Sequence, residues 1–180
     1  MRDRERQTSL IKKAALFLVV NLACLAGCGY HLRGVGSSLP STIKKIYVPV
    51  FKNFTTRYEL DLKLTQAVIN ELTTRGRLEL ANQAETADAV LLGEITSFVV
   101  TPLAFSGKDT ADKYNITIVA KINLRDIAHQ RLLFSHPSFV YVEEYEVPEG
   151  ADFESMEAEA LNRVAEKFAR SLVVAILEGF

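Results

Sequence analysis

The sequence predicts an α+β fold: a two-layer sandwich with a mixed, mostly antiparallel sheet of about four to five strands and two α-helices packed on one face. Three observations lead to it. Strand patterns gather in the middle of the chain, one helical pattern precedes most of them, and a second follows them. Strict alternation of apolar and polar residues over 114–125 indicates one buried sheet face. We expect the polar side chains of the long strands to define the other face.

The N-terminus is typical of an export signal. A basic head precedes thirteen mostly apolar residues, 14–26, which are too few to cross a bilayer, since that takes about 20. The run ends in Leu25-Ala26-Gly27-Cys28 and resembles the lipobox of bacterial lipoproteins. The resemblance implies lipidation at Cys28 and removal of a signal peptide, 1–27. Gly29, where lipoproteins retained in the inner membrane usually carry Asp, points to the outer membrane.

The charge is unevenly distributed along the chain. Residues 28–58 contain five basic residues and no acidic one, whereas the chain from Glu59 onward contains eleven basic and twenty acidic residues. Arg33, Lys44 and Lys45 could therefore act as a membrane-proximal basic arm attracted to headgroups, or be an ordinary solvated segment. The acidic balance of the mature chain argues against nucleic acid as a partner. No disulfide is possible once Cys24 is removed and Cys28 is lipidated.

An extended lipid-anchored arm, 28–43, leads to a single domain, 44–180. A strand is predicted at 46–51, with Pro49 at an edge or a bulge. A capping box, Thr56 to Glu59, is expected to begin a helix that ends at Gly76. Its core-facing line is Leu60, Leu64, Ala67, Val68 and Leu72.

The remaining elements are a short strand at 77–80, strands at 89–102 and 114–125, and a turn at 126–130. A strand at 132–147 follows, with a bulge or kink at His136-Pro137. A final helix begins near Asp152 and ends at Gly179. Its predicted core line is Leu161, Val164, Ala165, Phe168, Leu172, Ala175 and Ile176.

We find no pattern in the sequence that indicates an enzyme, a metal site or a cofactor site. The histidines have no metal-ligand spacing, and Glu143 and Glu144 are expected on opposite strand faces. Leu103 and Phe105, predicted on a loop between two long strands, could insert into a lipid or a partner, or cap the core.

The residues after the cysteine, Cys28-Gly29-Tyr30-His31-Leu32-Arg33-Gly34, resemble the opening of the LPS-assembly lipoproteins. The likeness covers essentially the whole mature chain. It continues through Leu39-Pro40, Ile46-Tyr47-Val48-Pro49, Phe51-Lys52-Asn53, the predicted helix, Ala87-Asp88-Ala89 and the strand containing Tyr114.

This resemblance implies a noncatalytic outer-membrane lipoprotein that plugs and helps assemble the LPS-translocon β-barrel, an LptD-type partner, and assists LPS delivery to the outer leaflet. It also implies LPS contact through basic residues at the domain tip, where the candidates are Lys108, Lys113 and Arg125. The alternative from the residues alone is a lipid-anchored periplasmic carrier of a small amphipathic ligand.

Overall fold

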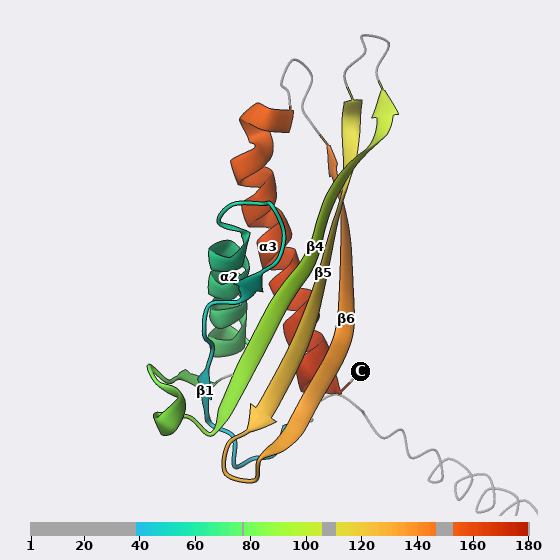
Figure 1. Ribbon diagram of the computed structural model, residues 1–180. Coiled ribbons are helices and arrows are strands. Elements are labelled where there is room, and N and C mark those ends of the chain that lie inside the picture. The colour runs from blue at the N-terminus through green and yellow to red at the C-terminus, as the bar shows by residue number, and fades with distance from the viewer. Residues whose placement is uncertain (1–38, 77, 106–110, 147–152, 180) are drawn as a thin grey trace, which may run out of the picture. The chain divides into compact units, whose positions relative to one another are not determined.

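The computed structural model describes residues 39–76, 78–105, 111–146 and 153–179, all within one compact unit, Gly36–Phe180. Within these residues six strands form one sheet, ordered β3-β1-β4-β5-β6, with β2 also paired to β4 (Figure 1). In chain order the elements are β1 (Lys45–Tyr47), β2 (Lys52–Asn53), α2 (Leu60–Thr74), β3 (Glu79–Leu80), the 3-10 helix η1 (Ala84–Thr86), β4 (Ala89–Phe105), β5 (Ala111–Asp126), β6 (Arg131–Glu146) and α3 (Phe153–Glu178).

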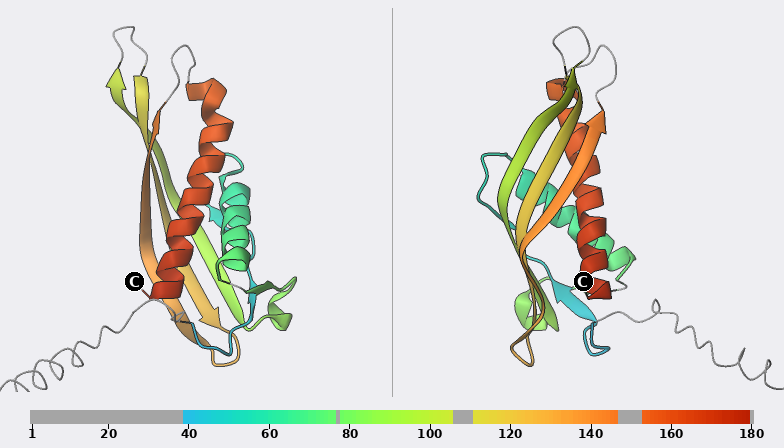
Figure 2. Two further views of the ribbon diagram at one scale, coloured as in Figure 1. Left: turned by 180° about the vertical axis from the view of Figure 1, so that it is seen from behind. Right: turned by 90° about the vertical axis from the view of Figure 1, so that its right-hand side faces the viewer.

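The sheet is mixed, and both helices cover the same face. The short strands β1 and β2 pair with β4 in parallel, whereas β4, β5 and β6 pair antiparallel. Figures 1 and 2 show α2 and α3 side by side against one side of this sheet. The predicted α+β fold is therefore confirmed.

The alternating pattern in β5 sets the two faces of the sheet. Its inward residues Ile116, Ile118, Ala120, Ile122 and Leu124 are all buried, and they meet the apolar line of α3. Of the seven predicted core residues of α3, six are buried and Ala175 is partly buried. At about 1.5 Å per residue, the 26 residues of α3 extend roughly 39 Å along strands of about 50 Å. One long helix can therefore cover most of the length of the sheet.

The predicted bulge in the last strand is also confirmed. Ala120 pairs with Phe139 and Ile122 pairs with His136, so between these two pairs β6 contains one more residue than β5. The additional residue lies at Pro137-Ser138, where a proline without an N–H interrupts the ladder.

Two predictions near the first helix are wrong in detail. Of the predicted strand 46–51, only 46–47 are strand, as part of β1; residues 48–51, with Pro49, are in no strand, and β2 follows at Lys52–Asn53. The predicted capping box is not formed: α2 begins at Leu60, and Glu59, at φ 57°, provides no side-chain cap. The reason is that the amide of Asn53 bonds the carbonyl of Arg57 at 2.7 Å, which holds the intervening residues in a separate turn.

A close contact between Phe51 and Gly93 joins this region to the sheet. A Cβ added at Gly93 would lie 2.5 Å from the Phe51 ring, so the ring rests directly on the β4 backbone. Phe51 is 2% exposed, and its N–H donates to the Thr65 hydroxyl at 2.9 Å. That hydroxyl donates in turn to the Asp61 carbonyl. Phe51 thereby connects β4 to α2.

Asp88 fixes the start of β1 beside β4. One of its carboxylate oxygens accepts the backbone N–H groups of Lys44 and Lys45, at 2.9 and 2.8 Å. The backbone of Asp88 also bonds Lys45 and Ile127. The bonds from the Lys45 and Lys44 amides hold the pKa of this carboxyl below its ordinary value.

Gly93→Ala should destabilise the domain by about 1–3 kcal/mol, because the new methyl group overlaps a buried ring. Chemical denaturation of the purified protein measures this loss. In Gly93→Ala/Phe51→Leu, the smaller side chain should restore part of it, so the two substitutions should be non-additive. Strict additivity would contradict the contact.

Asp88→Asn should lower stability at neutral pH by about 1 kcal/mol, because two charge-assisted hydrogen bonds are weakened. A carboxyl with a depressed pKa contributes its stability above the unfolded-state pKa and loses it as the pH falls through the folded-state value. The difference between the variant and wild type should therefore shrink below about pH 4. A difference in melting temperature that stays constant from pH 7 to pH 3 would refute this role.

Candidate binding surfaces

Lys113, one of the predicted LPS-binding residues, lies on the outward face near the end of the β4–β5 ladder. Its Nζ is 2.6 Å from Oε1 of Glu146, the residue that pairs with Lys113 on the neighbouring strand β6. The Glu146 carboxylate raises the pKa of Lys113, and Lys113 lowers the pKa of Glu146. The charge of Lys113 is thus matched by an acidic neighbour. Leu103, expected on a loop, lies instead on β4 and is 49% exposed; it does not cap the core.

Arg125 does not lie with Lys113, so the expectation that both belong to one tip is wrong. They are twelve positions apart along β5, which corresponds to about 40 Å of strand. Arg125 pairs in register with Val90 at the start of β4 and with Leu132 at the start of β6. The strand is continuous across this distance, so the two ends cannot approach one another. Lys108 lies outside the described residues, and so does the side chain of Phe105.

The described part of the predicted basic arm lies at the same end of the sheet as Arg125. Lys44 and Lys45 are exposed at the start of β1, and the Lys45 ammonium is 3.8 Å from a Glu79 carboxylate. Arg33 and the predicted lipidation site Cys28 lie outside the described residues.

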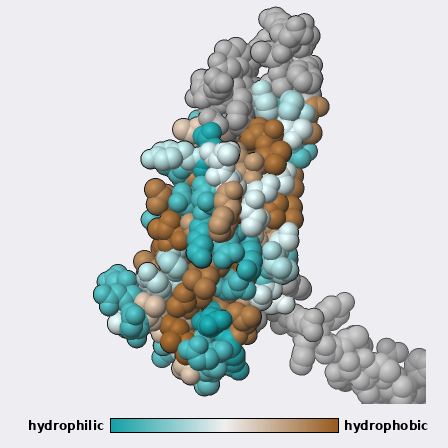
Figure 3. Space-filling view, viewed as in Figure 1, coloured by the Kyte–Doolittle hydropathy of each residue, from teal (hydrophilic) through white to brown (hydrophobic). Residues whose placement is uncertain are grey.

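The outward face of the sheet is less polar than expected. Half-exposed apolar side chains interrupt the polar pattern on β4 and β6, and the partly buried Val119 does so on β5. In register, Val119 is opposite Val140, and Thr117 lies between Val99 and Val142. Figure 3, which has the view of Figure 1 and so displays the side of the molecule with β4 and α2, also shows apolar patches between hydrophilic residues. The half-exposed large apolar residues of this face are Leu92, Val99, Leu132, Val140 and Val142.

Glu143 and Glu144 point to opposite faces, as predicted: Glu143 pairs with inward Ile116 and Glu144 with outward Asn115. Glu143 lies between β6 and α3, where it bonds the ammonium of Lys167 and the hydroxyl of Tyr141. Burial raises the pKa of Glu143, but these two donors outweigh it and lower the pKa overall. Burial and the carboxylate together raise the pKa of Tyr141 far above its ordinary value. This network joins α3 to the edge strand.

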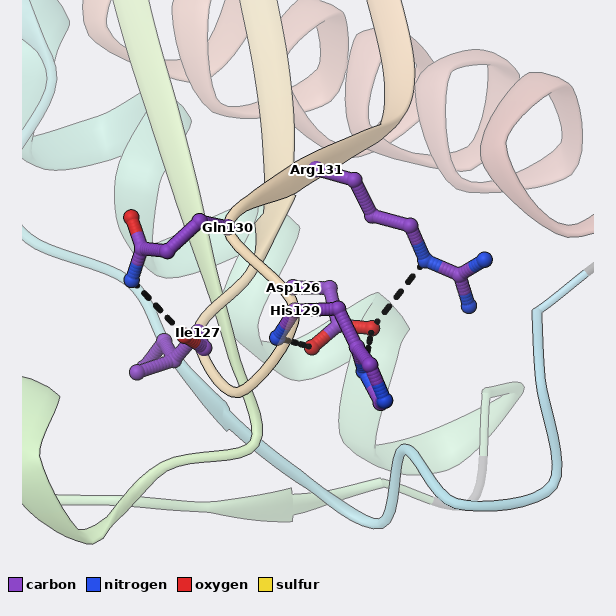
Figure 4. A network of polar contacts seen from close by, with 5 residues as sticks. All are labelled: Asp126, Ile127, His129, Gln130 and Arg131. Atoms are coloured by element: carbon purple, nitrogen blue, oxygen red, sulfur yellow. Dashed lines mark hydrogen bonds and ion pairs between the residues drawn. The ribbon is translucent and has the colours of Figure 1, made fainter.

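The β5–β6 turn is organised around a buried carboxylate. Asp126 is 1% exposed, and Figure 4 shows the backbone and ring of His129 and the side chain of Arg131 converging on it. The distances to the Asp126 carboxylate are 3.1 Å from the backbone N of His129, 2.8 Å from its Nδ1 and 3.3 Å from Nε of Arg131. Burial raises the pKa of Asp126, and the bonds from His129 and Arg131 outweigh it, so the pKa is lowered. His129 is a turn-forming residue here.

The loop between β2 and α2 exposes aromatic side chains that the sequence patterns did not single out. Phe54 is 66% and Tyr58 81% exposed. The loop borders a cleft of about 340 Å³, open to solvent, which is lined by Asn53, Thr55, Thr56, Arg57, Tyr58, Glu59, Asp61 and Leu62. One feature of the sequence could have indicated Phe54 and Tyr58 in advance: they are two aromatic residues in a polar segment whose pattern fits neither a strand nor a helix.

Within the described residues, no group of three or more His, Cys, Asp or Glu side chains could hold a metal ion. His31 lies outside these residues; His129 belongs to the turn, and His136 packs between Phe134 and Phe139. In the same part of the chain, no helix combines the length and apolarity needed to span a membrane.

Solved structures with this arrangement of helices and sheet come from several bacteria. A hypothetical protein, CT253, from Chlamydia trachomatis has a TM-score of 0.52 at 12% identity, covering 77% of this chain and 97% of that one. PelC from Paraburkholderia phytofirmans, solved as a dodecamer, has a TM-score of 0.52 at 14% identity, covering 80% of this chain and 96% of that one. Protein XCC0632 from Xanthomonas campestris has a TM-score of 0.52 at 14% identity, covering 76% of this chain and 85% of that one. At these identities the likeness establishes the fold alone.

Among curated proteins, the comparison found none that matches the chain. A protein-family model described as LptE, lipopolysaccharide-assembly, matches residues 43–176. This range runs from before β1 almost to the end of α3, and it contains the Phe51–Gly93 contact, the Asp88 bonds and the β5–β6 turn. The chain therefore belongs to the lipopolysaccharide-assembly (LptE) family.

Proposed function

We propose that this protein is a noncatalytic lipoprotein of the outer membrane, anchored by lipid at Cys28, which plugs and helps assemble the LPS-translocon β-barrel. In that position it assists transport of LPS and its insertion into the outer leaflet. The observation that carries the proposal is the family match over residues 43–176. The lipobox-like Leu25-Ala26-Gly27-Cys28 adds the anchor, since several acyl chains on one residue give stable attachment.

The described surface suits a plug better than a carrier. The inward sheet face is filled by two helices, and the cleft at Asn53 to Leu62 is open and lined mainly by polar residues. A carrier of an amphipathic ligand would need an enclosed apolar cavity. By contrast, the polar side chains of the outward face suit contact with the polar interior of a barrel, and such contact would also remove its half-exposed valines from water.

The LPS contact is assigned to the end of the domain beyond Lys113. Phosphate groups of LPS attract cations, and Lys108 lies within the segment of the chain that links β4 to β5. Lys113 would contribute only if LPS phosphate competes with Glu146 for its ammonium. Arg125, at the opposite end of β5, is withdrawn from this site.

The proposal predicts that the full-length tagged lipoprotein, extracted from its own outer membranes in mild detergent, co-purifies with a large outer-membrane β-barrel identified by mass spectrometry. Cys28→Ser should abolish incorporation of labelled palmitate and reduce recovery from the outer-membrane fraction. Recovery of the acylated wild-type protein as a folded monomer without a barrel would overturn the proposal.

Lys108→Glu should weaken LPS binding, because a carboxylate replaces a cation where phosphate is expected. The full-length protein and purified LPS are the reagents, and retention of LPS on the immobilised protein is the measurement. Arg125→Glu is the matched control, since it makes the same charge change at the other end of the sheet. Equal retention by wild type and Lys108→Glu would remove Lys108 from the site.

A further inference from the structure

The second half of β4 lies at an open edge of the sheet. β1 pairs with β4 at Ala89 and Val90, and β2 pairs with it at Glu94 and Ile95. Beyond Ile95, β5 is the only strand of the described chain that pairs with β4, and Figure 1 shows no strand on the other side of its upper part. We name residues 97–103 the open β4 edge. They extend over about 20 Å.

The backbone of the open β4 edge determines what it can bind. A strand edge offers N–H donors and C=O acceptors at a regular spacing, and another extended polypeptide matches that pattern. Val99 and Leu103 are 48% and 49% exposed, and Thr101 and Pro102 are also exposed. An exposed apolar edge strand is a template for pairing with a further strand, and β-branched side chains favour such pairing.

The opposite edge of the sheet, β6, is protected against the same pairing. The bulge at Pro137 interrupts this strand near its middle. The half of β6 beyond the bulge carries three carboxylates, Glu143, Glu144 and Glu146. Charged side chains, prolines and bulges are the means by which natural edge strands avoid association. The open β4 edge contains no charge, and its one proline, Pro102, is close to its end.

The absence of charge favours a second copy of this chain as the added strand. No charged residue occurs from Ile95 to Gly107. Two identical strands that pair around a two-fold axis run antiparallel, so a charged residue near the axis would lie close to the same charge on the other copy. An uncharged edge avoids this repulsion. A different protein, by contrast, is commonly selected through complementary charges, which this edge does not offer.

We infer that two copies of this protein associate through their open β4 edges, antiparallel and centred on Val100. In this register Val99 of one copy lies opposite Thr101 of the other on the outward face, and this contact of two β-branched side chains occurs twice. Phe98 lies opposite Pro102, which can accept but not donate a hydrogen bond. The paired segment is therefore short.

The assembly closes at two copies, because pairing around the axis occupies the open β4 edge of each copy and the remaining edges are the protected β6 strands. The inference concerns the lipoprotein without its partners, and it does not rest on the proposed function. Pairing also covers the edge that would otherwise be exposed to non-specific strand addition.

The first test places a cysteine on the predicted axis. In the full-length protein, mildly oxidised in intact cells, Val100→Cys should form a disulfide-linked dimer, because the two side chains are neighbours across the axis. Leu103→Cys is the control on the same edge. It is more exposed to random collision, but its two copies are about 20 Å apart in this register. Cys24 and Cys28 are common to both variants.

A dimer band several-fold stronger for Val100→Cys than for Leu103→Cys, identified by mass spectrometry, is the expected result. Equal bands, or a disulfide from position 100 to a different protein alone, would overturn the inference.

The second test alters the charge of the edge. Two differently tagged full-length copies are produced together, and recovery of one copy with the other is measured in mild detergent. Val99→Lys/Thr101→Lys places like charges opposite each other twice and should reduce co-recovery by roughly tenfold. Val99→Lys/Thr101→Glu places opposite charges there and should restore it. Val140→Lys/Val142→Lys makes the same charge change on β6 and should have no effect.

Melting temperatures near wild type in all three variants confirm that each is folded. No co-recovery of wild-type copies, or the same co-recovery with the Lys/Lys and the Lys/Glu variants of β4, contradicts pairing in this register.

Discussion

Phe51 lies between the sheet and α2, and its ring occupies the space that any side chain at position 93 would need. The contact is possible only because residue 93 is glycine, which brings the ring onto the backbone of β4. The same residue donates its N–H to Thr65 of α2. One residue thereby contacts both the sheet and α2, and it directly precedes β2 and the loop that exposes Phe54 and Tyr58. Buried packing and surface presentation are physically connected here.

Two buried or shielded carboxylates perform the corresponding task at the end of the sheet near β1. Asp88 holds the amides of Lys44 and Lys45, and Asp126 closes the β5–β6 turn. The carbonyl of Asp88 also accepts the N–H of Ile127 in that turn, so the two sites support each other. The far end of the ladder has instead the exposed pair Lys113–Glu146, which is screened by solvent and salt and contributes less to rigidity. The end of the sheet near β1 is thus held by a network of shielded hydrogen bonds.

Most of the fold could be predicted from the sequence because its signals are local. Alternation in β5 and the apolar line of α3 each depend on nearest neighbours along one element, and both are confirmed. The start of α2 could not be predicted. The Asn53 side chain bonds the carbonyl of Arg57 in place of the expected capping box, and a sequence pattern does not show which of the two interactions is stronger. The placement of Arg125 failed for a different reason. The position of a residue along the 16-residue strand β5 determines the end of the sheet at which it lies. The resemblance to the family grouped Arg125 with Lys113 at the domain tip without regard to this position. The exposure of Tyr58 required the three-dimensional structure.

The account depends most directly on Phe51 as the residue that holds α2, β4 and the loop between β2 and α2 together. Native-state hydrogen exchange of the full-length protein measures this at one amide, since the N–H of Phe51 is bonded to a buried hydroxyl. We predict that this amide exchanges only through global unfolding, as slowly as the inward amides of β5. Exchange orders of magnitude faster than in β5 would mean that the segment opens independently, and would contradict the account.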